Sequence, residues 1–139
     1  MQLFPYLSFN GNCRQALTFY ADLFGGTVNT LMPWYAEAIK DVPGATEKHI
    51  MHGDITIQGH TIAGSDQFGD MYAPAGNISL MIDINDVEEA RSKFDALAEG
   101  GQIMMPFGET FFADGYGFCT DRFGIMWQIN CTGNKAAPA

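Results

Sequence analysis

The chain has 139 residues, of which 47% are hydrophobic and 17% charged, and its formal net charge is −9. This length fits one domain with a buried core, and this composition excludes an intrinsically disordered chain. Seven Lys and Arg against 16 Asp and Glu argue against nucleic acid as a partner. No apolar run reaches the roughly 18 residues that a membrane span needs, and no secretory signal is visible at the N-terminus.

The cysteines indicate a reducing compartment. Cys13, Cys119 and Cys131 are odd in number and lack a CxxC spacing. Without a secretory signal, this usage favours free, buried thiols in a cytoplasmic protein.

The first half of the chain predicts a strand, a helix and three further strands. Residues 3–10 alternate polar and apolar side chains, and residues 12–24 place apolar side chains at helical spacing. Asn10 or Asn12 can cap this helix, and Gly25 and Gly26 can end it. A strand near 27–32, an irregular polar stretch to about 47, and a hairpin of strands 49–57 and 60–66 follow.

The second half repeats this order. The segment FNGNCRQALTFYADLFGG at 9–26 corresponds to INDVEEARSKFDALAEGG at 84–101, and each runs from a strand end through a helix to a Gly-Gly pair. The spacing of about 75 residues indicates a duplicated module, because a solenoid needs three or more shorter units. The second half predicts a strand at 77–84, a helix capped by Asp86, and strands near 102–106, 114–120 and 124–131.

The predicted fold is α+β, with duplicated βαβββ modules that form a curved mixed sheet around a cleft. We expect a single domain over 1–139, with modules at 1–70 and 75–133 and a disordered tail at 134–139. In the strands, alternation predicts an apolar face under the helices that includes Phe9, Ile55, Ile78 and Trp127. The opposite face is polar and predicts a ligand surface, with a solvated sheet face as the alternative. Its side chains are Tyr6, Ser8, Asn10, His52, Asp54, Thr56, Ser79, Asp83, Gln128 and Asn130.

Three segments resemble a known family. They are PYLSFNGNCRQALTFY, the His52 strand that ends in Gly64-Ser65-Asp66, and ETFFADGYGFCTDRFGIMWQIN. Together they resemble the PhnB-like subgroup of the vicinal oxygen chelate superfamily, which includes glyoxalase I, extradiol dioxygenases and bleomycin- and fosfomycin-resistance proteins. The resemblance covers essentially the whole chain. One departure is Phe112, where the subgroup typically has Trp.

The resemblance also implies where a metal would bind. Members that use a metal place His or Glu ligands at positions that fall here near Tyr6, Ala63, Ser79 and Gln128. A neutral amide and hydroxyl groups are poor ligands for Zn, Fe or Ni. We therefore predict no metal site and no cofactor, although a divalent metal stays open as an alternative.

Two ionisable residues are candidates for catalysis. His52 lies two residues from Asp54 on one strand face, so it can act as a general base or line a polar pocket. Glu109 precedes an aromatic segment that can raise its pKa and make it a proton donor or acceptor; alternatively, it bonds backbone amides in a loop.

Aromatic and polar side chains are the candidates for ligand binding. An aromatic wall of Trp34, Phe111, Phe112 and Tyr116 can stack on a flat or cationic ligand, or pack in the core or a dimer contact. The other candidate ligand-binding residues are Tyr6, Ser8, Asp54, Ser79 and Gln128.

Two functions remain open from the sequence. The first is a metal-independent small-molecule binding protein of the glyoxalase/bleomycin-resistance type, expected as a homodimer. The second is a lyase- or isomerase-like enzyme that uses His52 and Glu109 in proton transfer, with or without a divalent metal. Members of the subgroup are often labelled 3-demethylubiquinone-9 3-methyltransferase. The sequence does not support that activity, because its Gly-Gly pairs follow helices, whereas a methyl-donor site normally has a Gly-rich turn before one.

Overall fold

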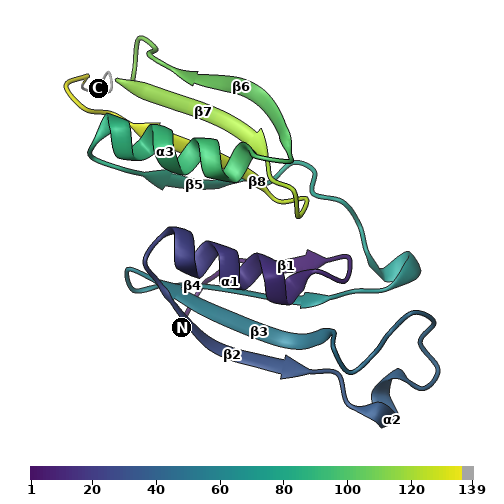
Figure 1. Cartoon of the computed structure of the whole chain (residues 1–139). Coiled ribbons are helices and arrows are strands. Elements are labelled where there is room, and N and C mark those ends of the chain that lie inside the picture. Colours follow the sequence, from purple (N-terminus) through teal and green to yellow (C-terminus); the bar gives the residue numbers. More distant parts are fainter. Residues whose placement is uncertain (136–139) are drawn as a thin grey trace. The chain divides into compact units, whose positions relative to one another are not determined.

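A computed structural model describes residues 1–135, and the chain divides into two compact units, Met1–Ala73 and Pro74–Ala139. Each unit contains one four-stranded mixed sheet and one long helix (Figure 1). This is the duplicated α+β architecture that the sequence predicts. The predicted enclosure of one cleft by the two modules, and the module limits, remain predictions.

The sheet of the first unit has the strand order β1-β4-β3-β2. Strand β1 runs parallel to β4, and the other neighbours are antiparallel. The elements of this unit are β1 (Tyr6–Phe9), α1 (Cys13–Leu23), β2 (Thr27–Pro33), α2 (Ala36–Ile39), β3 (Ile50–Ile57), β4 (His60–Asp66) and the 3-10 turn η1 (Gly69–Met71).

The sheet of the second unit has the equivalent order β5-β8-β7-β6, again with one parallel pair, β5 and β8. Its elements are β5 (Leu80–Asp83), α3 (Val87–Ala98), β6 (Gln102–Gly108), β7 (Gly115–Thr120) and β8 (Met126–Cys131). The helix begins after Asp86, whose carboxylate accepts a hydrogen bond from the backbone N–H of Glu88 at 3.0 Å, as the sequence predicts for a capping residue.

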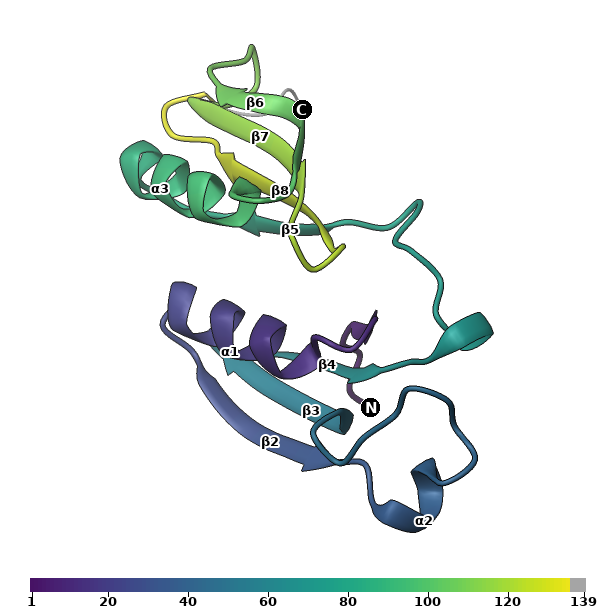
Figure 2. The same cartoon turned by 45° about the vertical axis from the view of Figure 1, so that its right-hand side comes forward.

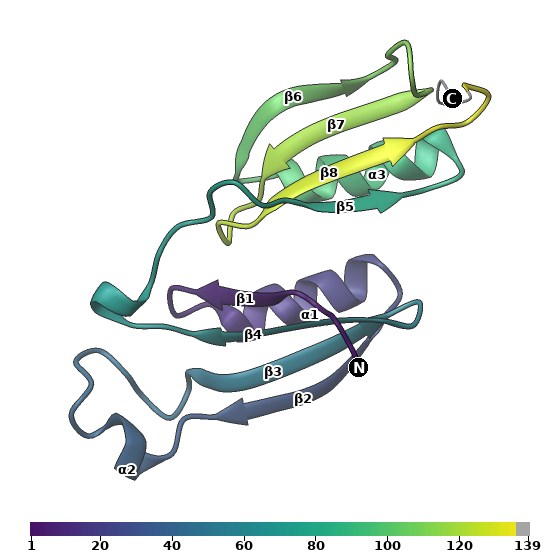
Figure 3. The ribbon, with the colours of Figure 1, turned by 180° about the vertical axis from the view of Figure 1, so that it is seen from behind.

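Each long helix packs on one face of its own sheet. In the first unit α1 contacts β2, β3 and β4, and in the second α3 contacts β6, β7 and β8 (Figure 2). Seen from behind, each sheet stands in front of its helix (Figure 3). We call the face turned away from the helix the open face of that unit.

The core of each unit lies between helix and sheet. In the first unit Phe9, Leu17, Tyr20 and Ile55 are all 0% exposed. In the second unit Trp127, Leu97 and Ile129 are 0% exposed and Phe94 is 1% exposed. Burial of these large apolar side chains is the main source of stability in each unit.

The repeated Gly-Gly pairs have a structural reason that is the same in both units. The first glycine of each pair adopts a left-handed backbone, with φ of +68° at Gly25 and +75° at Gly100. The second glycine lies against a strand: a Cβ on Gly26 would be 2.4 Å from the Thr56 carbonyl oxygen, and one on Gly101 would be 2.0 Å from that of Thr120. Each pair therefore ends a helix and lets the chain pass close to its sheet.

A buried aspartate organises the loops of each unit. Asp66 is 1% exposed and accepts hydrogen bonds from the backbone N–H groups of Cys13 and Ile50, at 2.9 and 2.7 Å. Asp121 is 3% exposed, and its side chain accepts from the N–H groups of Phe123 and Ile125 and from the Trp127 indole. A carboxylate that accepts several N–H donors can stay charged inside the protein.

Some expectations from the sequence are wrong in detail. Strand β5 begins at Leu80 and not at 77, and Ile78, expected on the buried face, is 75% exposed. The alternation of polar and apolar residues begins before the strand does, because alternation alone does not show which residues pair with a neighbouring strand. The polar stretch after residue 33 contains the short helix α2.

The three cysteines are free and buried, as predicted. No helix among residues 1–135 is long and apolar enough to cross a membrane. Asn134 and Lys135, the start of the expected tail, are hydrogen bonded to the second unit; residues 136–139 lie outside the described part of the chain.

Candidate functional site

The open face of the first unit brings together ionisable side chains from neighbouring strands. Tyr6 of β1 pairs with Ala63 of β4, and Ala63 pairs in turn with Asp54 of β3. Residues paired across neighbouring strands point to the same face, so Tyr6 and Asp54 share the open face. His52 lies two residues before Asp54 and faces the same way.

Four side chains of this face, including that of Asn29 on β2, contact one another in series. The Tyr6 hydroxyl lies 3.0 Å from Nδ1 of His52, and the two rings stack with centroids 5.7 Å apart. Nε2 of His52 lies 3.8 Å from Oδ1 of Asp54. The Asn29 amide donates to Oδ2 of Asp54 at 3.1 Å and to Thr56 Oγ1 at 2.8 Å. We call Tyr6, His52, Asp54 and Asn29 the His52 cluster.

The contacts assign the imidazole tautomer when His52 is neutral. A phenol is the natural donor to an imidazole nitrogen, so Nδ1 of His52 accepts and Nε2 carries the proton. That N–H is then on the side of the Asp54 carboxylate, whose Oδ1 lies 3.8 Å from Nε2. The arrangement places a hydroxyl within proton-transfer distance of a candidate base and a carboxylate beside it.

The open face of the second unit carries a neutral network. The Tyr116 hydroxyl donates to Gln128 Oε1 at 2.5 Å, and Gln128 Nε2 donates to Ser79 Oγ at 2.7 Å. Both ends of the Gln128 amide are therefore in use. Burial raises the pKa of Tyr116, which keeps this phenol protonated and able to donate. We call Ser79, Gln128 and Tyr116 the Gln128 network.

Three of the four residues predicted for an aromatic wall are neighbours in the second unit. Phe112 packs edge-on against Tyr116 with centroids 5.4 Å apart, and Phe111 packs edge-on against Phe112 at 5.2 Å. Phe111 is 85% exposed. These three rings form a ladder from the sheet to the surface. Trp34 belongs to the first unit, where its ring packs on Phe68 with centroids 6.1 Å apart.

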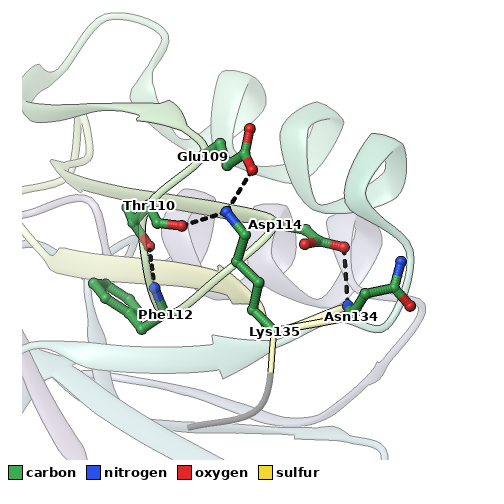
Figure 4. Close-up of polar contacts among 6 residues, drawn as sticks. All are labelled: Glu109, Thr110, Phe112, Asp114, Asn134 and Lys135. Carbon is green, nitrogen blue, oxygen red and sulfur yellow. Dashed lines mark hydrogen bonds and ion pairs between the residues drawn. The ribbon is translucent and has the colours of Figure 1, made fainter. Parts of the chain in front are cut away.

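Glu109 has a cationic partner that the sequence analysis missed. Lys135 Nζ donates to Glu109 Oε1 and, at 2.5 Å, to the backbone carbonyl oxygen of Thr110 (Figure 4). No local pattern pairs residues 26 positions apart, so the sequence contained no signal for this contact. Glu109 is thus held at the base of the loop that carries Phe111 and Phe112.

A second residue of this unit was underestimated from the sequence. Asn130 is 8% exposed, and its Nδ2 donates to Asp83 Oδ1 at 2.8 Å and to Thr132 Oγ1 at 3.1 Å. Its Oδ1 is buried without a hydrogen-bond partner among the described residues. Alternation placed Asn130 on the polar face but gave no indication that its carbonyl would be buried.

The remaining candidate, Ser8, is exposed on β1, where it pairs in register with Ser65 of β4. The first unit also has a hollow of about 730 Å³ that the sequence did not predict. It lies where the start of α1 meets the loop before β3, and its lining includes Arg14, Lys48 and His49. Across residues 1–135, no three His, Cys, Asp or Glu side chains are grouped so that they could hold a metal ion.

The two βαβββ units have the glyoxalase-type fold. The fosfomycin resistance protein FosX of Listeria monocytogenes has this fold: its structure matches 96% of the chain, and 92% of its own length is covered, with a TM-score of 0.62. The identity is only 10%, so this likeness concerns the fold.

The chain belongs to the PhnB-like subgroup of the vicinal oxygen chelate superfamily, since the family model described as 3-demethylubiquinone-9 3-methyltransferase matches residues 1–130. Protein YjdN of Escherichia coli is 35% identical over 94% of the chain and 95% of its own length. This confirms the resemblance seen in the sequence.

Two solved structures are similar over nearly their whole length. Protein PA1353 of Pseudomonas aeruginosa is 36% identical, with a TM-score of 0.82, over 96% of this chain and 99% of that one. The PhnB protein of Bacillus cereus is 25% identical, also with a TM-score of 0.82, over 94% of this chain and 99% of that one.

Proposed function

We propose that the protein binds a small organic molecule on the open face of its second sheet and does so without the metal of the superfamily. The observation that carries this proposal is the Gln128 network. Ser79 and Gln128 occupy positions where metal-using members have ligands, and here they bond to each other and to Tyr116. Their polar atoms orient a ligand surface and are not directed at a common ion.

The donor set at the four corresponding positions does not fit a divalent transition metal. Tyr6 offers a phenol, Ala63 a methyl group, Ser79 a hydroxyl and Gln128 an amide. Zn, Fe and Ni prefer imidazole, thiolate or carboxylate. A substrate-chelating metal is therefore no part of the proposed function.

The composition of the second open face supports binding of an organic ligand. The ladder of Phe111, Phe112 and Tyr116 supplies flat apolar surface beside the amide and hydroxyl groups of the Gln128 network. Small-molecule sites combine apolar and aromatic walls with a few fixed polar groups. This combination, within a superfamily that includes resistance proteins, favours sequestration of a small molecule.

A thermal-shift screen with EDTA present tests the proposal. The compounds are aromatic amines, thioesters and S-adenosylmethionine, the last because the family description names a methyltransferase. We expect an aromatic compound to raise the melting temperature equally with and without EDTA, since stabilisation reports binding to the native state. If EDTA abolishes the shift, the metal-free proposal fails.

Two variants locate the site in the same screen. Phe111→Ala removes an exposed ring and should weaken the shift without affecting folding, while Tyr35→Ala, at a ring 58% exposed in the first unit, should not. Equal shifts in both variants would contradict a site on the ring ladder. Stabilisation by S-adenosylmethionine alone would favour the activity named in the family description.

We propose, as a second candidate, a lyase- or isomerase-like enzyme in which His52 and Glu109 transfer protons, with or without a divalent metal. The His52 cluster favours it, because the Tyr6 hydroxyl lies 3.0 Å from Nδ1 of His52, within proton-transfer distance, and the Asp54 carboxylate lies beside the ring. Glu109 belongs to the other unit, where its carboxylate pairs with the Lys135 ammonium group.

Exchange of the α-hydrogens of dihydroxyacetone in D2O tests the second candidate. The wild type should accelerate exchange, and His52→Ala and Tyr6→Phe should each reduce it by at least about tenfold, since a positioned base contributes about 10²–10⁴-fold. His60→Ala, at an exposed histidine of β4, is the matched control and should leave the rate unchanged. Equal rates in wild type and His52→Ala would eliminate this candidate.

A further inference from the structure

The loop that carries the aromatic ladder binds an ammonium group. Glu109 Oε1 and the carbonyl oxygen of Thr110 both accept hydrogen bonds from Nζ of Lys135 (Figure 4). A charged carboxylate and a backbone carbonyl are acceptors only, whereas an ammonium group is a donor only. The two oxygens therefore form an ammonium cradle, and Lys135 is its occupant in the ligand-free chain.

The loop holds its shape through hydrogen bonds between backbone N–H groups and nearby oxygens. The N–H of Thr110 donates to the carbonyl of Ala113 at 3.0 Å, and the N–H of Phe112 donates to Thr110 Oγ1 at 3.2 Å. Asp114 Oδ2 accepts from the N–H of Asn134 at 3.0 Å. None of these three bonds involves the lysine side chain, and two of them lie entirely within the loop. Most of the shape is thus independent of the occupant, which lowers the cost of binding another one.

Two aromatic residues come directly after the cradle residues in the sequence. Thr110, which supplies the carbonyl, precedes Phe111 and Phe112, and Phe111 is 85% exposed. Aromatic faces attract organic cations, and their apolar surface binds the remainder of a flat molecule. Cradle and rings together match a ligand that carries an ammonium group on an aromatic body.

A second acceptor nearby lacks a donor. Asn130 is 8% exposed and its Oδ1 has no hydrogen-bond partner among the described residues. The neighbouring Asp83 carboxylate can only accept, so it fixes Nδ2 on its own side and Oδ1 as the unpaired atom. The same amide donates to Thr132, whose carbonyl accepts from the N–H of Lys135 at 3.0 Å. The bonds through Thr132 connect the segment that holds this acceptor to the turn that carries Lys135.

The natural occupant is held weakly enough to be displaced. The Glu109 side chain is 72% exposed, and an ion pair so open to water contributes little free energy. The surroundings also favour a cation, because Asp114, which accepts from the N–H of Asn134 beside Lys135, adds negative charge to that of Glu109. The acidic balance of the whole chain acts in the same direction.

We propose that residues 109–114 form the receptor for an aromatic ammonium ligand and that Lys135 is a built-in competitor for this site. The inference rests on the proposed function and names the ligand class and its regulation. Binding requires Lys135 to leave the cradle, so a ligand competes with an intramolecular ammonium group. Removal of the lysine side-chain charge therefore increases the affinity.

NMR titration with phenethylammonium tests the proposal, with phenethyl alcohol as the neutral probe of the same shape. Lys135→Met should bind phenethylammonium about fivefold more tightly than wild type, if Lys135 occupies the cradle in about four of five molecules. The largest shifts should occur at the backbone amides of 110–114. Lys48→Met, at an exposed lysine of the first unit, is the matched control and should bind as wild type does.

A second variant tests the cradle itself. Glu109→Gln in the Lys135→Met background should lose the gain, and the amide spectrum of each variant shows whether it is folded. Equal gains for phenethyl alcohol would overturn the ligand class, and no gain for either probe would overturn the competitor role. Both failures are distinct from that of the proposed function, which the metal-free thermal-shift screen decides with other compounds.

Discussion

The open faces of the two sheets differ in chemistry although the sheets share one topology. The first carries ionisable groups, with His52 between the hydroxyl of Tyr6 and the carboxylate of Asp54. The second carries the neutral Gln128 network, in which the Gln128 amide is bonded at both ends. The first face is thus suited to accept a proton, and the second to orient a ligand.

The buried sides of the two units, by contrast, share the same structural features. Both units end their long helix with a left-handed glycine followed by a glycine close to a strand carbonyl. Both use one buried aspartate, Asp66 or Asp121, to bind backbone N–H groups. The two units therefore share the features that maintain the fold and differ in the side chains of their open faces.

The largest effect expected from this comparison concerns the second glycine of each pair. Gly101→Ala would place a Cβ 2.0 Å from the Thr120 carbonyl oxygen and 2.9 Å from the Asp121 carbonyl carbon, so the backbone must move. We expect a loss of at least about 4 kcal/mol of unfolding free energy. Gly100→Ala changes only a left-handed residue and should cost about 1–2 kcal/mol. Urea unfolding measures both, and equal losses would contradict the close-approach argument.

Substitution of the buried aspartates should follow in size. Asp121→Ala removes the acceptor of three N–H groups and should cost about 4 kcal/mol, and Asp66→Ala, which leaves two N–H groups unpaired, about 3 kcal/mol. Asp22→Ala, at an exposed position of α1, is the control and should stay within about 0.5 kcal/mol of wild type. A larger loss for Asp66→Ala than for Asp121→Ala would contradict the argument that the loss follows the number of N–H groups left unpaired.

The cysteines beside these aspartates predict a loss of stability at alkaline pH. Burial, with a contribution from Asp66, raises the pKa of Cys13 from 9.0 to about 12, and burial with Asp121 raises that of Cys119 to about 11. In the folded state the thiol keeps its proton, so the stabilisation is complete below pH 9 and is lost as the pH rises toward 12.

Cys13→Ala should reduce this alkaline loss. Between pH 9 and 10 the wild type should lose about 1 kcal/mol more than the variant, measured by urea unfolding at each pH. Cys131→Ala serves for comparison, because the pKa of Cys131 is also raised by burial. Identical slopes for wild type and Cys13→Ala would contradict the raised pKa of Cys13.

The smallest effect should come from the ion pair on the second unit. Lys135→Met removes a contact with a largely exposed carboxylate and should change the unfolding free energy by less than about 1 kcal/mol. A much larger loss would make Lys135 a structural tether and weaken its proposed role as a competitor. Thermal unfolding at low and high salt provides the measurement.

The sequence predicted those features that depend on local patterns. Alternation and helical spacing located α1 and α3, and the Gly-Gly pairs marked where each helix ends. The position of His52 near Asp54 followed from their spacing along one strand. These features are short-range consequences of the two backbone periodicities.

Contacts between distant residues were not predictable. Nothing in the sequence links Lys135 to Glu109, or Tyr6 to His52 46 positions away. Likewise, the pattern placed Asn130 on the polar face but cannot show that its carbonyl is buried. Such contacts depend on strand register, which a single sequence specifies only weakly.

Metal analysis of protein purified without added metal tests most directly the claim that the fold is used here without the superfamily's metal. The account predicts no stoichiometric Zn, Ni, Mn or Fe, and ligand binding that is unchanged after EDTA treatment. One equivalent of such a metal that is lost in His52→Ala, together with ligand binding, would contradict it.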